Sequence, residues 1–194
     1  MRCLLACIPL AFTFVLSGCA TPRPLDSTLI TDARWRSVID AYTTAINTTR
    51  SDPYWHHHWL GNAAVLNQGP PHKGLCWQWR DHLDVMLAPA LASARLTARG
   101  IHTRRGTRME HNALIIFDPA TITDSALLTA PAPNPDSPPI ALVFDPWFCG
   151  EPAIYSVPDW SKLSFDGHPV GIDSRPFPVG QVSPPTRRDT SPAW

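Results

Sequence analysis

Lysine is scarce in this sequence of 194 residues, where Lys73 and Lys162 are the only two, and the formal net charge is zero. The isoelectric point lies near 7.1. Domains that bind nucleic acid carry clustered basic residues that neutralise phosphate groups. The balanced charge therefore gives no case for a nucleic-acid partner.

The sequence also lacks an apolar run long enough to cross a bilayer, which takes about 20 residues. The N-terminal apolar stretch, Leu4–Leu16, is shorter; it follows Arg2 and leads into Ser17, Gly18 and Cys19. A positive residue, a short apolar core and small residues in this order are typical of a secretion signal. We therefore expect residues 1–18 to be a signal that is removed on export.

Few cysteines remain once this signal is set aside. Cys3 and Cys7 belong to it, which leaves Cys19, Cys76 and Cys149. In an oxidising compartment the last two could simply pair. A Cys76–Cys149 disulfide therefore stays open as a structural explanation for both residues.

The segment Leu16-Ser17-Gly18-Cys19 resembles the lipobox of bacterial lipoproteins, in which two small residues precede the cysteine that takes the lipid. The resemblance implies that Cys19 is acylated, becomes the new N-terminus and holds the protein to a membrane through its acyl chains. Ala20 follows the cysteine, which under lipoprotein sorting rules implies the outer membrane, facing the periplasm. An ordinary signal peptide is the alternative.

Composition divides the rest of the chain into three parts. Residues 19–30 carry the lipidated cysteine and a proline-containing tether without apolar pattern. Residues 31–172 hold the helix and strand patterns and are predicted to form one domain. Residues 173–194 are rich in proline, arginine and serine and are expected to be disordered.

The domain is expected to begin with a helix that has an apolar stripe at helical spacing. Thr31 or Asp32 is its expected N-cap, and Pro53 stops it. The stripe consists of Trp35, Val38, Ile39, Tyr42 and Ile46.

A second helix is predicted from Cys76 to near Arg99, with Gly100 as its terminator and a kink or early break at Pro89. The segment 54–75 between the two helices is expected to be a loop with a short helical turn. The buried stripe of the second helix is predicted to be Trp79, Leu83, Met86, Leu87, Leu91 and Ala94.

After the helices the pattern changes to short, apolar, β-branched runs. His111–Phe117 and Ile140–Phe144 are predicted strands, joined by a long proline-rich connection, and Ile101–Thr107 and Ala153–Val157 are weaker ones. Helices that precede antiparallel strands favour an α+β fold, with N-terminal helices packed on a small antiparallel sheet.

Three residues are placed where their chemistry combines. Cys76 stands at the start of a predicted helix, where the helix dipole lowers the pKa of a thiol. His111 opens the first good strand, from which an imidazole could take the thiol proton. Asp145 follows the next strand and could hold that imidazole in one tautomer if the two strands pair. The sequence thus predicts a Cys-His-Asp site that needs no metal or cofactor.

A resemblance to known enzymes supports these three residues. Gly74-Leu75-Cys76-Trp77 resembles the Gly-x-Cys-Trp segment of transglutaminase-like and papain-like cysteine enzymes, and Asp145-Pro146-Trp147 resembles the segment that carries the acid of that superfamily. The superfamily has the same order of Cys, His and Asp. The resemblance implies a transglutaminase-like core with Cys76 as nucleophile, His111 as general base and Asp145 as orienting acid.

The donor to the oxyanion is left open by the sequence. Gln68 precedes Cys76 by eight residues and resembles the glutamine that papain-like enzymes place upstream. Trp55 or Trp59 could serve instead, as could the backbone N–H of Cys76. A competing acid, Asp118, stands nearer to His111 in an Asp-Pro pair and is expected to form a strand-end turn.

Two functions follow from this reading. The first is a membrane-anchored cysteine hydrolase or acyltransferase that acts on peptide or amide bonds, with cell-wall peptides suggested by location alone. The second is a non-catalytic envelope lipoprotein that binds a partner with the same fold. A metal site at His56–His58 is a third and weaker hypothesis, because consecutive histidines point in different directions.

Overall fold

The computed structural model describes four segments of the chain: residues 23–57, 62–147, 150–163 and 168–173. The predicted signal and the lipidation site at Cys19 lie outside them. Trp59, Cys149 and the predicted tail from residue 174 onward lie outside them as well. The domain described below is therefore the part of the chain that follows the predicted tether.

A five-stranded antiparallel sheet forms the centre of the domain, in the order β4-β3-β2-β1-β5. Its strands are β1 (Thr97–Thr103), β2 (His111–Phe117), β3 (Ala141–Phe144), β4 (Ile154–Tyr155) and β5 (Val170–Ile172). The helices are η1 (Ser27–Leu29), α1 (Ala33–Thr49), α2 (Asn62–Gln68), α3 (Cys76–Ala94), η3 (Asp124–Thr129) and α4 (Val157–Ser161). The predicted α+β class is confirmed.

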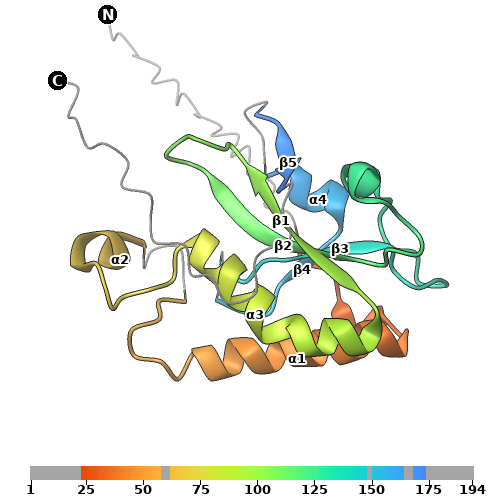
Figure 1. Ribbon diagram of the computed structural model, residues 1–194, viewed down its shortest axis with the longest axis horizontal. Coiled ribbons are helices and arrows are strands. Elements are labelled where there is room, and N and C mark those ends of the chain that lie inside the picture. The colour runs from red at the N-terminus through yellow and green to blue at the C-terminus, as the bar shows by residue number, and fades with distance from the viewer. Residues whose placement is uncertain (1–22, 58–61, 148–149, 164–167, 174–194) are drawn as a thin grey trace, which may run out of the picture.

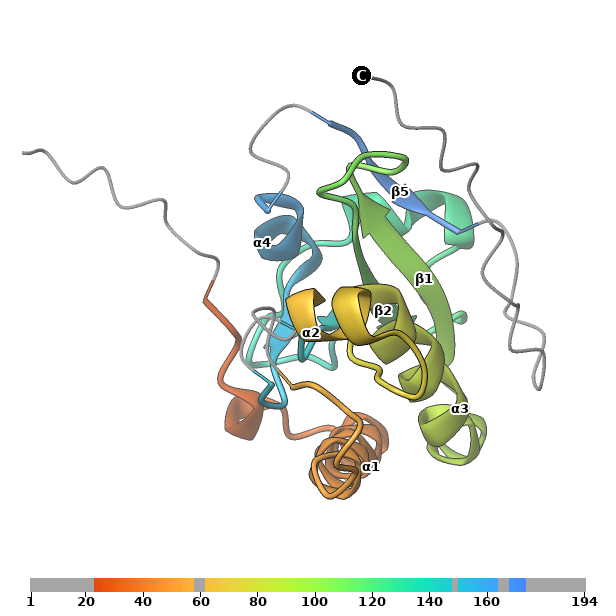
Figure 2. The ribbon, with the colours of Figure 1, turned by 90° about the vertical axis from the view of Figure 1, so that its left-hand side faces the viewer.

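The sheet is covered on both faces. Helices α1 and α3 lie along one face, and α4 and η3 lie on the other (Figure 1), an arrangement that Figure 2 shows from the side. Successive residues of a strand point to opposite faces, so Leu114 and Ile116 pack with α1 and α3 while Ile115 and Phe117 pack with α4 and η3. Strand β2 is buried along its whole length and lies at the centre of both cores.

The first helix forms as its sequence predicts. The carboxylate of Asp32 accepts hydrogen bonds from the backbone N–H groups of Arg34 and Trp35, at 3.0 and 3.1 Å, and so caps α1. The hydroxyl of Tyr42 donates to the Ala153 carbonyl at 3.0 Å, which ties the middle of α1 to the sheet. All five residues of the predicted stripe are buried.

The second predicted helix is right at its start and wrong at its end. Helix α3 begins at Cys76, continues past Pro89 and ends at Ala94, where Arg95 takes a left-handed conformation at φ 55°. Gly100 is not a terminator but lies within β1, because residues 97–103 pair with β2 along its full length. Met86 is 41% exposed, so it does not belong to the buried stripe.

The folded domain extends past both predicted boundaries. The backbone N–H of Leu25 donates to the Ile154 carbonyl at 2.7 Å, and Ile30 is buried, so the end of the predicted tether packs on the domain. At the other end Asp173 forms ion pairs with Arg80 and Arg105, although it was predicted to start the tail. Local composition shows prolines and charges but not the distant partners that order them.

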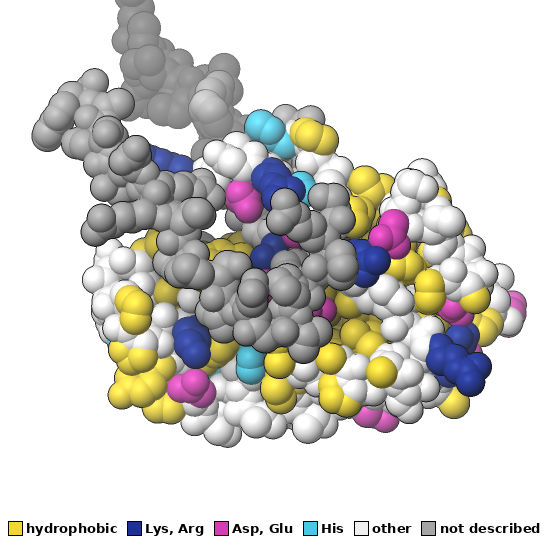
Figure 3. Space-filling view, viewed as in Figure 1, with side chains coloured by type: hydrophobic (Ala, Val, Ile, Leu, Met, Phe, Trp, Pro, Cys, Tyr) yellow, Lys and Arg dark blue, Asp and Glu magenta, His cyan; other side chains and the backbone are white. Residues whose placement is uncertain are grey.

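The surface of the described residues mixes charges of both signs. On the face in Figure 3, Lys and Arg side chains are interspersed with Asp and Glu rather than gathered by sign. Among the helices that the structure describes, none is both long enough and apolar enough to span a bilayer.

Candidate active site

The thiol of Cys76 lies in the first turn of α3. The side-chain oxygen of Gln78 accepts hydrogen bonds from the backbone N–H groups of Gly74 and Leu75, at 2.8 and 3.0 Å, which fixes the chain as it enters the helix. Aligned peptide dipoles give the N-terminus of a helix a partial positive charge. The sulfur therefore sits where negative charge is favoured, as the sequence predicted.

His111 and Asp145 are brought together by the pairing of β2 with β3. The two strands are antiparallel, and Leu114 pairs with Phe144, the last residue of β3. Asp145 follows Phe144 and therefore lies near the start of β2, where His111 stands. The imidazole Nε2 lies 2.6 Å from the carboxylate Oδ2 of Asp145. Both residues are buried, with only 4% and 1% of their surface exposed.

Two tryptophans complete the surroundings of this pair. The indole N–H of Trp160 donates to Oδ2 of Asp145 at 2.7 Å, and the backbone N–H of Trp147 donates to Oδ1 at 3.2 Å. Their rings also lie beside the imidazole, with centroids 4.7 Å from His111 for Trp147 and 5.7 Å for Trp160. Aromatic faces favour a neighbouring cation, so these rings suit a protonated imidazole.

The charge of His111 is stabilised by its partners. Burial alone lowers the pKa of an imidazole, but the charge of Asp145 and its hydrogen bond, with a further hydrogen bond to Cys76, raise the pKa of His111 to about 10. Nε2 is the ring nitrogen that faces Asp145. Asp145 and Cys76 are therefore both among the groups that raise the pKa of His111.

The sulfur is correspondingly acidic. Burial raises the pKa of the Cys76 thiol, but hydrogen bonding to His111, the charge of His111 and hydrogen bonds from Asn112 outweigh this, and the net pKa is lowered. Cys76 forms no disulfide with any residue of the described segments. Its predicted alternative partner, Cys149, lies outside the described residues.

These shifts make the free energy of unfolding depend on pH, with opposite signs for the two groups. The pKa of His111 is higher in the folded protein than in the unfolded chain, where it is about 6.5. Protonated His111 therefore stabilises the fold in full below about pH 6.5, and this contribution is lost as the pH rises toward 10. The lowered pKa of Cys76 stabilises the fold above the ordinary thiol value, and the contribution is lost as the pH falls through the lowered one. In the pH range where both groups titrate, the decrease in stability due to His111 and the increase due to Cys76 oppose each other.

We expect Cys76→Ala to remove this offset. The pKa of His111 should fall in the variant, because the hydrogen bond and the charge of Cys76 help to raise it, so the fold should lose the contribution of His111 at a lower pH than in the wild type. Denaturant unfolding at a series of pH values measures this. Parallel pH profiles for the two proteins would show that sulfur and imidazole do not exchange a proton.

The predicted hydrogen-bond donors to the oxyanion differ in where they lie relative to Cys76. Gln68 ends α2, and its exposed side chain makes no hydrogen bond to Cys76 or to any other residue of the described segments. Trp55 is buried against Trp79, with ring centroids 5.0 Å apart. The backbone N–H of Cys76 is the candidate that already lies at the sulfur.

The competing acid and the histidine run have structural surroundings. Asp118 lies at the end of β2 opposite to His111, where it pairs with Arg34 at 2.9 Å and accepts from the Ala120 N–H, as expected of a strand-end turn. His56 faces His72, with ring nitrogens 3.0 Å apart. No group of three or more metal-binding side chains occurs within the four described segments.

Four residues around the site were not found from the sequence: Trp147, Trp160, Asn112 and Arg80. Trp147 and Asn112 stand within two residues of a predicted site residue, and this proximity could have singled them out. Arg80 lies one helical turn after Cys76, and this helical spacing could have singled it out. Trp160 carries no such signal and reaches the site only through tertiary packing.

Comparisons with protein-family models, with curated proteins and with solved structures find no match to this chain. The site contains a buried pair, His111 and Asp145, and a thiol, Cys76, whose pKa is lowered.

Proposed function

We propose that the chain is a cysteine hydrolase or acyltransferase that acts on peptide or amide bonds through Cys76, His111 and Asp145. The observation that carries the proposal is the 2.6 Å contact between His111 and Asp145, with Cys76, at the start of α3, among the groups that raise the pKa of the same imidazole. A histidine with a purely structural role needs neither a buried carboxylate at its ring nor a thiol that raises its pKa.

The proposed reaction starts from a thiolate and an imidazolium. The sulfur of Cys76 attacks the carbonyl carbon of the amide, and the C=O electron pair moves to oxygen. His111 then gives its proton to the departing nitrogen as the C–N bond breaks, which leaves a thioester. Water or an amine attacks the thioester, loses a proton to His111, and the C–S bond breaks to restore the thiolate. Asp145 keeps the imidazole oriented throughout.

A transglutaminase-like core is part of this proposal. In support, the nucleophile begins a helix, the histidine begins β2 and the acid follows β3, which is the order of that superfamily. The helix that bears the sulfur also packs against the strand that bears the imidazole, since α3 and β2 share one core.

The proposal includes a lipid anchor at Cys19. Such an anchor would hold the enzyme at the outer membrane, facing the periplasm, where peptide stems of the cell wall are the amide substrates at hand. The short stretch between residue 19 and the domain would keep the site near that surface.

The pH dependence of Cys76 alkylation tests the proposal. We expect iodoacetamide to modify Cys76 of the full-length protein with a midpoint at least one pH unit below that of a free thiol, which is about 8.5. Mass spectrometry of the peptide that contains Cys76 separates it from the other cysteines. His111→Ala should return the midpoint to the ordinary range or above it, because burial, the largest influence on this thiol, is then opposed by the hydrogen bonds from Asn112 alone. An alkylation midpoint near pH 8.5 in the wild type would overturn the proposal.

A second candidate function is a non-catalytic binding domain, which is favoured by one observation: Cys76 is only 7% exposed. Burial slows alkylation at every pH, so the midpoint and not the absolute rate separates the two functions. The binding domain predicts an ordinary or raised midpoint, since a buried thiol without an ion pair keeps its proton.

A further inference from the structure

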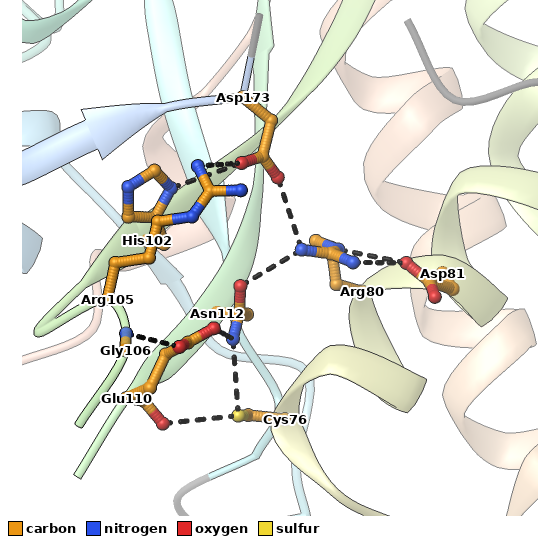
Figure 4. A network of polar contacts seen from close by, with 9 residues as sticks. All are labelled: Cys76, Arg80, Asp81, His102, Arg105, Gly106, Glu110, Asn112 and Asp173. Carbon is orange, nitrogen blue, oxygen red and sulfur yellow. Dashed lines mark hydrogen bonds and ion pairs between the residues drawn. The ribbon is translucent and has the colours of Figure 1, made fainter. Parts of the chain in front are cut away.

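A second polar group approaches the sulfur of Cys76 from β2. Asn112 follows His111, so its side chain points to the opposite face of the sheet, toward α3. Its amide Nδ2 lies 3.8 Å from the sulfur and 3.2 Å from Oε1 of Glu110, and its Oδ1 accepts from Arg80 at 2.9 Å. Asn112 is 5% exposed. Figure 4 shows this side chain between Cys76 and Arg80.

The network decides which end of the amide faces the sulfur. A guanidinium group only donates hydrogen bonds, so the oxygen of Asn112 must face Arg80. A carboxylate only accepts, so the NH₂ group must face Glu110. Both constraints agree, and they leave one N–H of Asn112 directed at the sulfur.

Arg80 is itself held in place. Its Nη1 also lies 3.2 Å from Oδ2 of Asp173, and its Nε and Nη2 donate to Oδ1 of Asp81 at 2.9 and 2.7 Å. Arg80 lies one helical turn after Cys76, so α3 fixes the distance between the guanidinium and the sulfur. The side chain is 13% exposed, which keeps the network largely out of water.

We propose that Asn112 stabilises the thiolate of Cys76 by donating a hydrogen bond to it, and that Arg80 is the positioning residue that fixes the amide for this purpose. The inference deepens the proposed function and depends on it. The acidity of the sulfur agrees, because hydrogen bonds from Asn112 are among the contacts that lower the pKa of Cys76. Hydrogen bonds to charged groups are the stronger kind, and a thiolate gains more from this donor than a thiol does.

Leucine has nearly the shape of asparagine without its donor, so Asn112→Leu is the direct test. We expect the alkylation rate of Cys76 at about pH 6 to fall at least about tenfold and the midpoint to rise, whereas the rate at high pH stays the same. Arg80→Leu should shift the midpoint in the same direction but by less, because the amide loses the donor that holds its oxygen while Glu110 still orients its NH₂ group. The matched control is Arg99→Leu, which removes a similar ion pair, to Asp124 at 2.9 Å, at the far end of β1.

Wild-type protein provides a measurement that does not depend on how a variant folds. The side-chain NH₂ signals of Asn112, followed by NMR, should shift with the same midpoint as Cys76 alkylation, and the shift should be absent in Cys76→Ala. If Asn112→Leu leaves the midpoint unchanged, or the NH₂ signals do not follow the thiol, the inference is overturned while the Cys-His-Asp proposal stands. An ordinary midpoint in the wild type overturns the proposed function instead.

Discussion

Asp145→Ala is expected to abolish the low-pH reactivity of Cys76 and to lower the free energy of unfolding by about 3–5 kcal/mol. The carboxylate is 1% exposed and accepts from the Trp160 indole and the Trp147 backbone as well as contacting His111. Its removal leaves three buried polar groups without their acceptor, and each unsatisfied group costs about 1–3 kcal/mol.

The effect on reactivity follows from the charge of His111. Asp145 is the group that raises the pKa of this imidazole against the opposing effect of burial. Without the carboxylate only burial remains as a strong influence, so His111 becomes neutral at neutral pH. A neutral imidazole does not stabilise a thiolate beside it, and the alkylation midpoint of Cys76 should rise by one unit or more, which is at least about tenfold in rate at low pH.

Two further variants separate charge from structure. Asp145→Asn keeps an oxygen acceptor but not the charge, so it should recover part of the stability and little of the reactivity. Asp118→Ala removes a buried carboxylate that pairs with Arg34 at 2.9 Å, at the opposite end of β2. It should cost stability and leave the midpoint of Cys76 unchanged. If Asp118→Ala and Asp145→Ala shift the midpoint equally, Asp145 has no special role.

The sequence allowed the placement of Cys76, His111 and Asp145 to be predicted because each marks the end of a well-patterned element. Cys76 begins a helix with a clear apolar stripe, and His111 begins a strand without polar interruption. The antiparallel pairing of two such strands then brings Asp145 to His111 by register alone. Short-range patterns and one assumed pairing were therefore sufficient.

The rest of the site depends on contacts that no local pattern encodes. Trp160 reaches Asp145 from α4, a helix of five residues that is too short to show periodicity. Asp173 lies at the end of β5, a three-residue edge strand within a stretch of unremarkable composition. The end of α3 was misplaced for a related reason: residues 97–99 suit a helix locally, but they pair with β2 instead.

Gly74→Ala is expected to lower the free energy of unfolding by about 3 kcal/mol, the combined cost of backbone strain and a steric clash. Gly74 has φ +129°, a conformation that residues with a side chain rarely adopt, and a Cβ atom there would lie 2.3 Å from the carbonyl oxygen of His56. That carbonyl belongs to a segment held in place by the bond from the His56 N–H to the Lys73 carbonyl, at 2.8 Å. Neither side of the contact can move freely.

The clash should also displace the sulfur of Cys76. Gly74 and Leu75 enter α3 through their bonds to Gln78, so a displaced residue 74 moves Cys76 relative to His111. The alkylation midpoint of Cys76 should therefore rise together with the loss of stability. Gly69→Ala is the matched control, because Gly69 also has a positive φ, +65°, but has nothing within 4 Å of a new Cβ. It should cost only the strain of a left-handed residue, about 1–2 kcal/mol, and leave the midpoint where it is. Equal losses in the two variants would mean that the approach of His56 to Gly74 does not position the thiol.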